Sequence, residues 1–435
     1  MDDRLGSTAT PRFAEAAKLW LKVGFISFGG PAAQIAILHE ELVERRRWID
    51  ERTFLTALNF CMLLPGPEAQ QLATYLGLKL HGLRGALTAG TLFVLPGAAV
   101  LYGLAWLAAA HGSWPPLAAM FRGMLPIVVA LIAHAVWRIG SRTLKSPVSW
   151  GLAIFAFVGL AIFHIPFPLI IGVALIMGLV AESRGWPTSA VGDISHEAHP
   201  VLLPIRWAQG LRRFAIYTLV FTVLWAVPLG VAMWVAGTQP FADIALFFTQ
   251  AAFVTFGGAY AVLPFVAQAA VGHFGWLSNT EMVHGLALAE TTPGPLILVT
   301  QYVGFFAGWN AAIAGQAGGL SPLAAASLAA AITTWVTFLP CFYFVLVGAP
   351  MVERISKDRR AQAALSAVTA AVVGVIATLA IIILGEAVFP GGRFDVLAAC
   401  VAASAFIAAW RFKIGALWLV VAGALFGLAR TAANV

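Results

Sequence analysis

Apolar stretches long enough to cross a bilayer recur along almost the whole of this 435-residue chain. A transmembrane helix needs about 20 apolar residues, because the hydrocarbon core is roughly 30 Å thick. Inside lipid every backbone polar group must find its partner within the protein, and a helix satisfies its own groups. Only 10% of the residues are charged, against about a quarter in soluble domains. We therefore predict an all-α polytopic membrane protein and exclude a water-soluble enzyme.

The charges and the cysteines exclude two further classes of protein. The formal net charge is +7, but Lys and Arg fall in short clusters between apolar segments, which is typical of topology signals and contacts with membrane lipid. We expect no nucleic-acid partner. Cys61, Cys341 and Cys400 lie in apolar segments without a CxxC spacing. Neither a metal site nor a disulfide framework is therefore predicted.

Three unrelated motifs occur twice in the chain at one spacing. Each motif of the first copy is followed by its second copy 228 residues later. The pairs are Phe28-Gly29-Gly30 with Phe256-Gly257-Gly258, Trp48 with Trp276, and Pro65-Gly66-Pro67 with Pro293-Gly294-Pro295. Further along the chain the spacing grows to 244, and residues 308–322 absorb the difference. Chance does not explain three motifs at one ungapped spacing, so we predict a duplication.

The repeat divides the chain into four parts. Residues 1–12 form a polar N-terminus without the features of a signal peptide, and we predict that it is cytoplasmic. Residues 13–183 are the first repeat and residues 237–435 the second. Residues 184–236 contain a polar linker, predicted to be cytoplasmic, and one unpaired apolar segment over 214–236.

Loop charges indicate that the two repeats have opposite orientations, because cytoplasmic loops carry an excess of Lys and Arg. The basic loop at residues 45–52 corresponds to residues 273–280, which contain neither Lys nor Arg. Conversely, the uncharged loop at 111–116 corresponds to a basic loop at 354–360. The unpaired segment at 214–236 crosses once and supplies the inversion. Inverted repeats of this kind are typical of secondary transporters.

Each repeat begins with two interrupted apolar stretches. In the first repeat, residues 13–45 are interrupted at Gly29-Gly30-Pro31, and residues 54–80 are interrupted at Pro65-Gly66-Pro67. Both ends of each stretch have the character of cytoplasmic segments. We therefore predict two re-entrant helical hairpins with their tips at mid-membrane. In the second repeat the corresponding hairpins enter from the other side.

Longer apolar segments follow the hairpins and form the predicted scaffold. Residues 86–110 and 118–139 are long enough to span the membrane, and residues 148–163 pair tightly with 167–180. The predicted fold class is thus an all-α polytopic membrane protein with two inverted-topology repeats, each with two re-entrant helical hairpins plus spanning helices.

The interruptions predict an anion-binding site. Non-helical backbone at membrane depth is tolerated only where protein buries it or where it lines a watery cavity. Helices that restart at such tips direct backbone N–H groups and positive dipole ends inward, where an anion binds. The alternative is that Gly and Pro only kink packed membrane helices. The predicted substrate-binding residues are Gly29, Gly30, Pro31, Gln34, Pro65, Gly66, Pro67, Gly257, Gly258, Pro293, Gly294 and Pro295.

Four ionisable side chains in apolar segments are candidates for coupling or gating. Glu68 follows the first Pro-Gly-Pro tip and Glu290 precedes the second, so either could carry a proton beside the anion. For Glu68 the alternative is a cap that only stabilises the bend. Lys22 could reach the anion, or it could belong to the wet face of an interfacial helix. His134 is either a titrating or a buried hydrogen-bonded histidine.

These motifs resemble those of a known transporter family. Phe28-Gly29-Gly30-Pro31 with Trp48 and Leu64-Pro65-Gly66-Pro67, together with their second copies, is similar to the chromate ion transporter family in its long two-domain form. The match covers nearly the whole chain. It departs from the pattern at Ala259, where the first copy has Pro31. We therefore expect the two halves to contribute unequally.

The resemblance implies a secondary transporter that exports chromate by alternating access across the cytoplasmic (inner) membrane of a prokaryote and confers chromate resistance. Sulfate is the expected chemically similar competitor, and a proton or another counter-ion is the expected coupling partner, as in an antiporter. Transport implies no cofactor, and a homo-oligomer is compatible with the sequence. The alternatives are an anion channel and a sulfate-type oxyanion carrier. An enzyme is disfavoured, because no catalytic residues or metal ligands cluster in the sequence.

Overall fold

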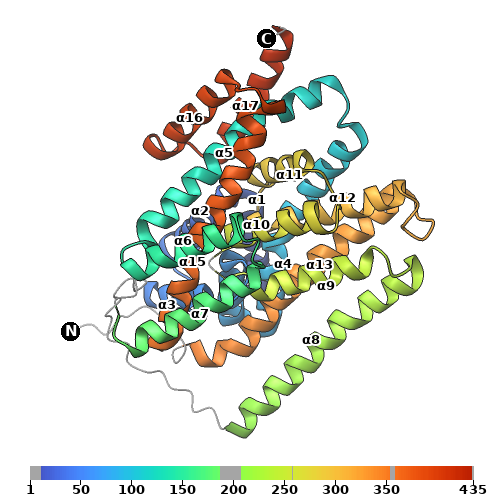
Figure 1. The fold of residues 1–435 in the computed structure, drawn as a ribbon. Coiled ribbons are helices and arrows are strands. Elements are labelled where there is room, and N and C mark those ends of the chain that lie inside the picture. Colours follow the sequence, from blue (N-terminus) through green and yellow to red (C-terminus); the bar gives the residue numbers. More distant parts are fainter. Residues whose placement is uncertain (1–10, 187–206, 257, 353–357, 434–435) are drawn as a thin grey trace.

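The computed structural model describes residues 11–186, 207–256, 258–352 and 358–433, and every regular element in these ranges is a helix (Figure 1). The protein is therefore all-α, as predicted. Most of the predicted polar N-terminus, the greater part of the predicted linker, Gly257 and part of the basic loop near residue 354 lie outside the described residues.

Two helix pairs open the first half of the chain. α1 (Phe13–Ile26) precedes α2 (Gly30–His39), and α2 continues as the π-helical segment η1 (Glu40–Arg45). α3 (Glu51–Leu63) precedes α4 (Glu68–His111). Short loops with the Gly-Gly and Pro-Gly-Pro motifs separate the members of each pair, so the motifs end one helix and begin the next.

The remaining helices of the first half are longer or tightly paired. α4 is kinked at His81 and Gly82, where the backbone dihedrals are not helical, and this kink separates its first turns from the predicted span over 86–110. The helices that follow α4 are α5 (Pro115–Thr143), α6 (Pro147–Ala161) and α7 (Phe167–Ser183). α6 and α7 correspond to the predicted tight pair.

The second half repeats this order of elements. Its helices are α9 (Phe241–Val254), α10 (Ala259–Ala267), η2 (Gln268–His273), α11 (Asn279–Thr291), η3 (Leu296–Leu298), α12 (Val299–Ile313), α13 (Pro322–Gly348), η4 (Ala349–Met351), α15 (Arg359–Val388), η5 (Pro390–Gly392), α16 (Val396–Arg411) and α17 (Ala416–Ala432). η1 and η2 are both π-helical and lie 228 residues apart, as do α3 and α11. Because π-helical segments are rare, this recurrence is what a duplicated fold requires.

The outer surface suits lipid. Large apolar side chains are exposed there, and Trp234 of α8 (Trp207–Ala236) is 87% exposed. α8 lies along one edge of the molecule, where it packs against α9 and α13 (Figure 1). Among the described residues, six helical stretches are long and apolar enough to cross a membrane, namely Glu68–His111, Pro115–Thr143, Leu211–Ala236, Leu296–Ile313, Pro322–Met351 and Arg359–Val388.

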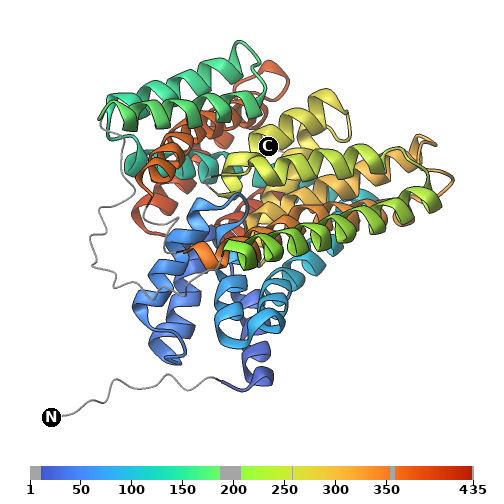
Figure 2. The same cartoon turned by 90° about the horizontal axis from the view of Figure 1, so that it is seen from below.

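The two halves pack against each other reciprocally. α15 packs against α6 and α7 (orange-red and green in Figure 2), while α5, at the corresponding place in the first half, packs against α16 and α17. Gly178 of α7 lies against the carbonyl oxygen of Ala363 in α15, and Gly427 of α17 lies against that of Ala119 in α5. A Cβ atom at either glycine would overlap the facing helix. Small residues of this kind let membrane helices approach closely.

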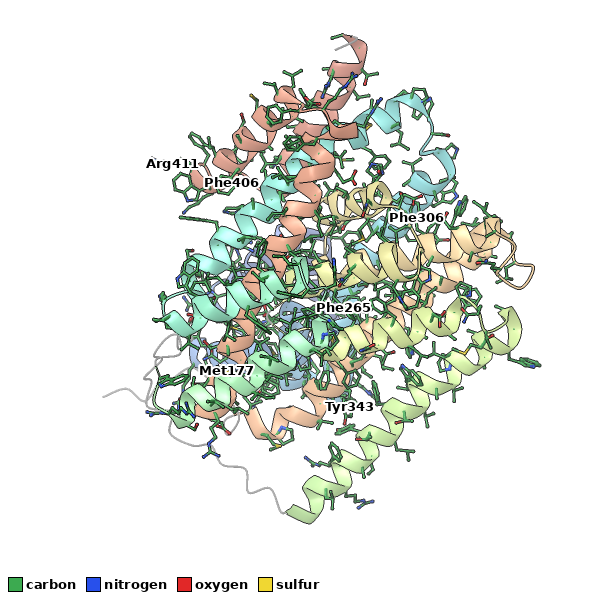
Figure 3. All side chains as sticks on the ribbon, in the orientation of Figure 1. Met177, Phe265, Phe306, Tyr343, Phe406 and Arg411 are labelled. Carbon is green, nitrogen blue, oxygen red and sulfur yellow. The ribbon has the colours of Figure 1, made fainter. Side chains whose placement is uncertain are left out.

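Aromatic rings fill the interior between α7, α9 and α10. Phe265 of α10 is half-buried near the centre of the view in Figure 3, and its ring stacks on Phe167 of α7 with 5.2 Å between centroids. Phe247 of α9 contacts the same ring at 5.0 Å. Aromatic side chains bury large apolar areas. The cluster therefore holds α10 against helices from both halves.

Candidate functional site

Four short loops interrupt the helix pairs, and their described residues are buried or half-buried near the middle of the molecule (Figure 1). We call them the central loops. They are the first and second Gly-Gly loops, residues 27–29 and 255–258, and the first and second Pro-Gly-Pro loops, residues 64–67 and 292–295. Each loop ends one helix and precedes the next, and contacts between the loops bring the helix ends of both halves to one place.

Two backbone hydrogen bonds tie the central loops together across the halves. The Gly66 N–H donates to the carbonyl oxygen of Thr255 at 2.7 Å, and the Gly294 N–H donates to that of Ser27 at 2.8 Å. Thr255 and Gly294 are the second copies of Ser27 and Gly66, so the same bond is made twice with the halves exchanged. Each Gly-Gly loop is therefore held by the Pro-Gly-Pro loop of the other half.

The glycines of the central loops adopt backbone conformations that other residues rarely reach. At Gly66 a Cβ atom would also lie only 2.8 Å from the Gln71 Nε2 atom and 2.9 Å from the Cys341 Sγ atom. A side chain at this position is thus excluded both by φ and by space. The loop glycines with positive φ are Gly29 (89°), Gly30 (78°), Gly66 (121°), Gly258 (92°) and Gly294 (87°).

The prolines lie where the helices begin or where the loops turn. Pro31 is in the first turn of α2, and Pro67 and Pro295 immediately precede α4 and η3. Proline needs no hydrogen-bond donor at these positions. The carbonyl oxygen of Pro65 accepts a hydrogen bond from Gln71 Nε2 at 2.6 Å. In the second Pro-Gly-Pro loop, the carbonyl oxygen of Pro293 lies against Gly97 of α4.

The helices that begin at the central loops have uncapped N-termini. α2, α4 and α10 start after Gly29, Pro67 and Gly258, and no side chain there caps the helix. By contrast, Asp50 and Ser278 cap α3 and α11 at the opposite ends of the pairs. The first N–H groups of a helix have no partner within it. The three uncapped helices therefore present donors and positive dipole ends that suit an anion.

Gln34 braces the loops. Its Nε2 atom donates to the carbonyl oxygen of Gly294 at 2.5 Å and lies 3.4 Å from that of Ser27. The side chain is buried. Both acceptors belong to the pair of loops already joined by the Gly294 N–H, so the amide reinforces that junction. Gln34 thus lies among the central loops, with its donor group directed at loop carbonyls.

Glu290 is buried at the end of α11, just before the second Pro-Gly-Pro loop. Only 7% of the residue is exposed. Its Oε1 atom accepts a hydrogen bond of 2.6 Å from the hydroxyl of Tyr260, the second residue of α10. The hydroxyl in turn lies 3.9 Å from the place that a Cβ atom would take on Gly30. A carboxyl and a phenol are therefore brought together against the first Gly-Gly loop.

Glu68 is the first residue of α4 and faces the loop of the other half. Its Oε1 atom lies 3.6 Å from the place that a Cβ atom would take on Gly258. Among the described residues no side chain or backbone group forms a hydrogen bond or an ion pair with it. A carboxyl in the first turn of a helix is stabilised by the helix dipole. Glu68 is thus available to a mobile partner.

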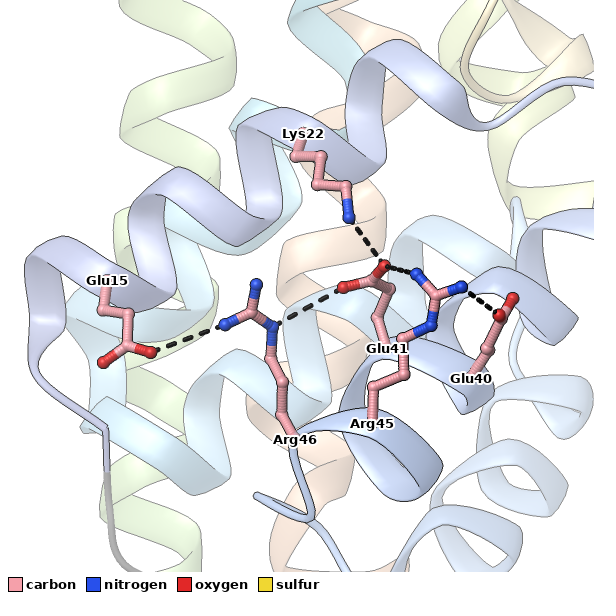
Figure 4. Close-up of polar contacts among 6 residues, drawn as sticks. All are labelled: Glu15, Lys22, Glu40, Glu41, Arg45 and Arg46. Carbon is pink, nitrogen blue, oxygen red and sulfur yellow. Dashed lines mark hydrogen bonds and ion pairs between the residues drawn. The ribbon is translucent and has the colours of Figure 1, made fainter.

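Lys22 does not face the central loops. Its Nζ atom forms an ion pair of 2.7 Å with the Oε1 atom of Glu41 in η1, at the far end of α2 (Figure 4). Arg46 bridges the same Glu41 to Glu15 of α1, with contacts of 3.5 and 3.4 Å. The structure therefore puts Lys22 into the charged face that it shares with Glu15, which was the alternative interpretation from the sequence.

His134 also lies away from the central loops. Its ring meets that of Phe406 on α16 edge to face, with 6.3 Å between centroids. Ala133 and Phe406 belong to the lining of a cavity of about 380 Å³ between α5, α15 and α16. The other lining residues are apolar too. His134 thus stands beside an apolar cavity, separate from the loops that carry the predicted anion site.

Two residues near the site were not singled out from the sequence. Tyr260 stands where the first copy has Ala32, so a comparison of the two copies beyond Ala259 would have found it. The positive charge of Arg138 in α5 has only a weak electrostatic effect on Tyr260 and Glu290. Arg138 is the next-to-last residue of the predicted span 118–139. Ionisable residues in such spans are candidates for a functional role, and this was the signal that pointed to Arg138.

Metal ligands are not gathered here. Within the ranges that the structure describes, no group of three or more His, Cys, Asp or Glu side chains could hold a metal ion. Cys61 and Cys341 are both buried as free thiols. The chemistry at the central loops is therefore that of backbone donors, one phenol and two carboxyls.

Known proteins resemble this chain over most of its length. The sequence profile described as "Chromate transporter" matches residues 14–179 and 242–428. A chromate transport protein of Pseudomonas aeruginosa is 32% identical over 94% of this chain and 90% of its own length. A probable chromate transport protein of Synechococcus elongatus is 30% identical over 86% and 84%, and a chromate transport protein of Cupriavidus metallidurans is 28% identical over 84% and 81%. No solved structure matches the chain.

Proposed function

Because this chain belongs to the chromate transporter family, we propose that it is a secondary transporter that exports chromate across the cytoplasmic membrane. The observation that carries the proposal is the reciprocal bonding of the central loops, in which Gly66 and Gly294 each reach the Gly-Gly loop of the other half. Broken helices from two related halves around one midpoint are the arrangement of many alternating-access carriers. Export of this kind would confer resistance to chromate.

The two halves are proposed to be inverted repeats. Their corresponding loops carry opposite charge, with the basic residues 45–52 matched by the uncharged residues 273–280. The contacts of α15 with α6 and α7, and of α5 with α16 and α17, are those expected of a two-fold axis between opposed copies. The positive-inside rule then puts η1 and the N-terminus on the cytoplasmic side, with α8 crossing between the repeats.

The helix pairs that carry the central loops are proposed to be re-entrant hairpins. α1 and α3 contain 14 and 13 residues. At 1.5 Å per residue they are about 20 Å long, which is too short to cross a hydrocarbon core of about 30 Å. Both end at buried or half-buried loops, where a re-entrant hairpin would turn back. Such interruptions are tolerated because other parts of the protein surround them.

The transported anion is proposed to bind between the central loops. Chromate and sulfate are tetrahedral dianions, which need several convergent N–H donors and some positive charge. The uncapped first turns of α2, α4 and α10 supply the donors and the positive ends of the helix dipoles. The proposed ligands include Gly257, which lies outside the described residues. Sulfate is expected to compete, because these donors recognise the same oxygen geometry.

Glu68 and Glu290 are proposed to couple transport to protons. Both lie in or beside the central loops, one in each half. A carboxylate beside a dianion repels it, whereas a protonated carboxyl does not. Proton binding and anion binding would then depend on each other. Replacement of both residues by Gln is expected to remove the dependence of transport on the proton gradient while some exchange of anion persists.

Uptake of radiolabelled chromate into everted membrane vesicles tests the proposed function. An exporter takes up chromate in this orientation, and we expect saturable uptake that depends on an imposed gradient and is inhibited by sulfate. Chromate conductance at channel rates in planar bilayers would contradict a carrier and support an anion channel. Saturable uptake of sulfate without chromate would identify a sulfate-type carrier instead.

A further inference from the structure

The Tyr260 hydroxyl has one hydrogen to donate, and it lies between a carboxyl and the first turn of α2. In the structure the hydroxyl donates to the Oε1 atom of Glu290 at 2.6 Å. The same oxygen lies against Gly30, the first residue of α2, at 3.9 Å from the place of a Cβ atom. Tyr260 itself is in the first turn of α10, and 8% of it is exposed. The hydroxyl thus stands between the N-termini of two helices and a buried carboxyl.

We propose that Tyr260 is a ligand of the transported oxyanion and that its hydroxyl leaves Glu290 when the anion binds. The inference rests on the proposed function, because it requires an oxyanion at the central loops. A phenol donates a single hydrogen bond. It can therefore serve the carboxyl of Glu290 or an oxygen of the anion, and not both at once.

The surroundings of the hydroxyl favour this exchange. Hydrogen bonds to charged acceptors are roughly twice as strong as neutral ones, so a dianion competes well with a carboxyl for the phenol. The first turn of α2 beside Gly30 is uncapped and offers donors to the same anion. An oxyanion held at this point would thus meet a phenol and helix N–H groups.

Only the second half can supply this ligand. The residue that corresponds to Tyr260 in α2 is Ala32, which has no donor, and the residue that corresponds to Glu290 in α3 is Met62. The pair is therefore an addition to one copy of an otherwise repeated loop arrangement. The second half would therefore bind the anion through the Tyr260 hydroxyl, which Glu290 gives up, whereas the first half would have no such ligand.

Binding of radiolabelled chromate to the purified protein in detergent micelles tests the inference. Equilibrium dialysis would give Kd for the wild type, Tyr260→Phe, Glu290→Gln and the double variant. Phe removes one oxygen and keeps the ring, while Gln keeps an acceptor and removes the charge. We expect Tyr260→Phe to weaken binding about threefold in the wild type and about tenfold in the Glu290→Gln background. The second effect is larger because a neutral amide competes less for the hydroxyl.

The test depends on whether Tyr260→Phe weakens binding more, or less, in the Glu290→Gln background than in the wild type. If Tyr260 only holds Glu290 in position, its hydroxyl matters less once the charge of Glu290 is gone, and Tyr260→Phe has the smaller effect in the Glu290→Gln background. That order, or an equal effect in both backgrounds, overturns the inference. Tyr102→Phe is the matched control, because the Tyr102 hydroxyl bonds Ser327 at 2.6 Å and should leave Kd unchanged. A wild type that binds no chromate would instead contradict the proposed function.

Discussion

At the base of the first helix pair, where α2 runs into η1, charged side chains hold the turn together. At the corresponding place in the second half, where α10 runs into η2, aromatic rings hold it. We call these regions the ionic base and the aromatic base. In the ionic base Glu41, with a side chain only 4% exposed, contacts Lys22 at 2.7 Å, Arg45 at 3.0 Å and Arg46 at 3.5 Å (Figure 4). One buried carboxylate thus organises three cations.

The aromatic base has no counterpart of that carboxylate. Ala269 of η2 stands where η1 has Glu41. The ring of Phe274 stacks on Trp276, with 4.2 Å between centroids and an interplanar angle of 5°. Phe247 and Phe248 of α9 surround the same indole at 5.8 and 5.9 Å. Apolar burial therefore does at this base what ion pairing does at the other.

The two bases nevertheless share one stacking position. The Arg46 guanidinium lies over the ring of Trp48 at 5.0 Å, and Phe274 and Trp276 are the second copies of these two residues. The backbone, the π-helical segment and the tryptophan recur, while the group on the indole changes from cation to ring. A cation suits a cytoplasmic interface and an aromatic ring suits either interface. The difference teaches that side chains diverged around a repeated backbone, in the direction that the proposed inversion of the halves would require.

The largest effect is expected at the central loops, where the halves are alike. Gly66→Val and Gly294→Val should each abolish chromate uptake by everted vesicles while the protein still inserts. Both positions have positive φ, which strains a β-branched residue by roughly 1–3 kcal/mol. The Val side chain at position 66 would also collide with Gln71 and Cys341, which would have to move away. Gly103→Val is the matched control, because Gly103 has open space around it. Loss of uptake in only one of the two variants would break the equivalence of the loops.

The tryptophans should show a clear inequality between the bases. Trp276 is buried under three phenylalanines, so Trp276→Ala should lower the free energy of unfolding by about 3 kcal/mol. Trp48 is half-exposed and loses mainly its contact with Arg46, so Trp48→Ala should cost about 1 kcal/mol. Denaturant titration in detergent micelles measures both. Equal losses would mean that the aromatic base is no better packed than the ionic one.

Much of this arrangement could be predicted from the sequence. Gly and Pro mark the interruptions between helices, and each interruption occurs in both copies of the repeat. The residues at Gly29, Gly66, Gly258 and Gly294 therefore fell where the helices end. The opposite loop charges were equally visible. Such features depend on neighbours along the chain, and local rules describe them well.

Contacts between helices could not be predicted in the same way. Lys22 and Glu41 are 19 residues apart and meet only because α1 passes over η1. Tyr260 and Glu290 meet because α10 and α11 converge on one loop. The sequence identifies such ionisable groups as costly in lipid. It does not identify their partners, which depend on how the helices cross.

The ionic base should be weakened by removal of its one buried acid. Glu41→Gln leaves Lys22, Arg45 and Arg46 without their common partner and should cost about 2 kcal/mol of unfolding free energy. This is less than the roughly 3–5 kcal/mol of fully buried pairs, because the cations are 32–59% exposed and keep much of their hydration. Glu40→Gln is the control, since that exposed pair with Arg45 should be worth less than about 1 kcal/mol. A similar loss in both variants would contradict the central place of Glu41.

Acid should weaken the ionic base by protonating Glu41. Glu41 lies outside the six spanning stretches. Burial raises the pKa of Glu41, but the hydrogen bond and charge of Lys22, with the charges of Arg45 and Arg46, outweigh it and hold the pKa below the ordinary value of 4.5. A carboxyl with a lowered folded pKa contributes stability above its unfolded pKa and loses it as pH falls through the folded value. Below pH 4.5 the wild type should therefore lose stability more steeply than Glu41→Gln.

The smallest effect is expected from Lys22, and it separates the two interpretations of that residue. Its side chain is 47% exposed and shares Glu41 with two arginines, so Lys22→Gln should change the unfolding free energy by less than about 1 kcal/mol. Because its ammonium group is directed at Glu41 and away from the central loops, KM for chromate in everted vesicles should stay within about twofold. Tyr260→Phe provides the contrast, since it removes a hydroxyl beside the central loops and should raise KM. A rise in KM for Lys22→Gln that matched the rise for Tyr260→Phe would return Lys22 to the anion path and make the ionic base part of the transport machinery.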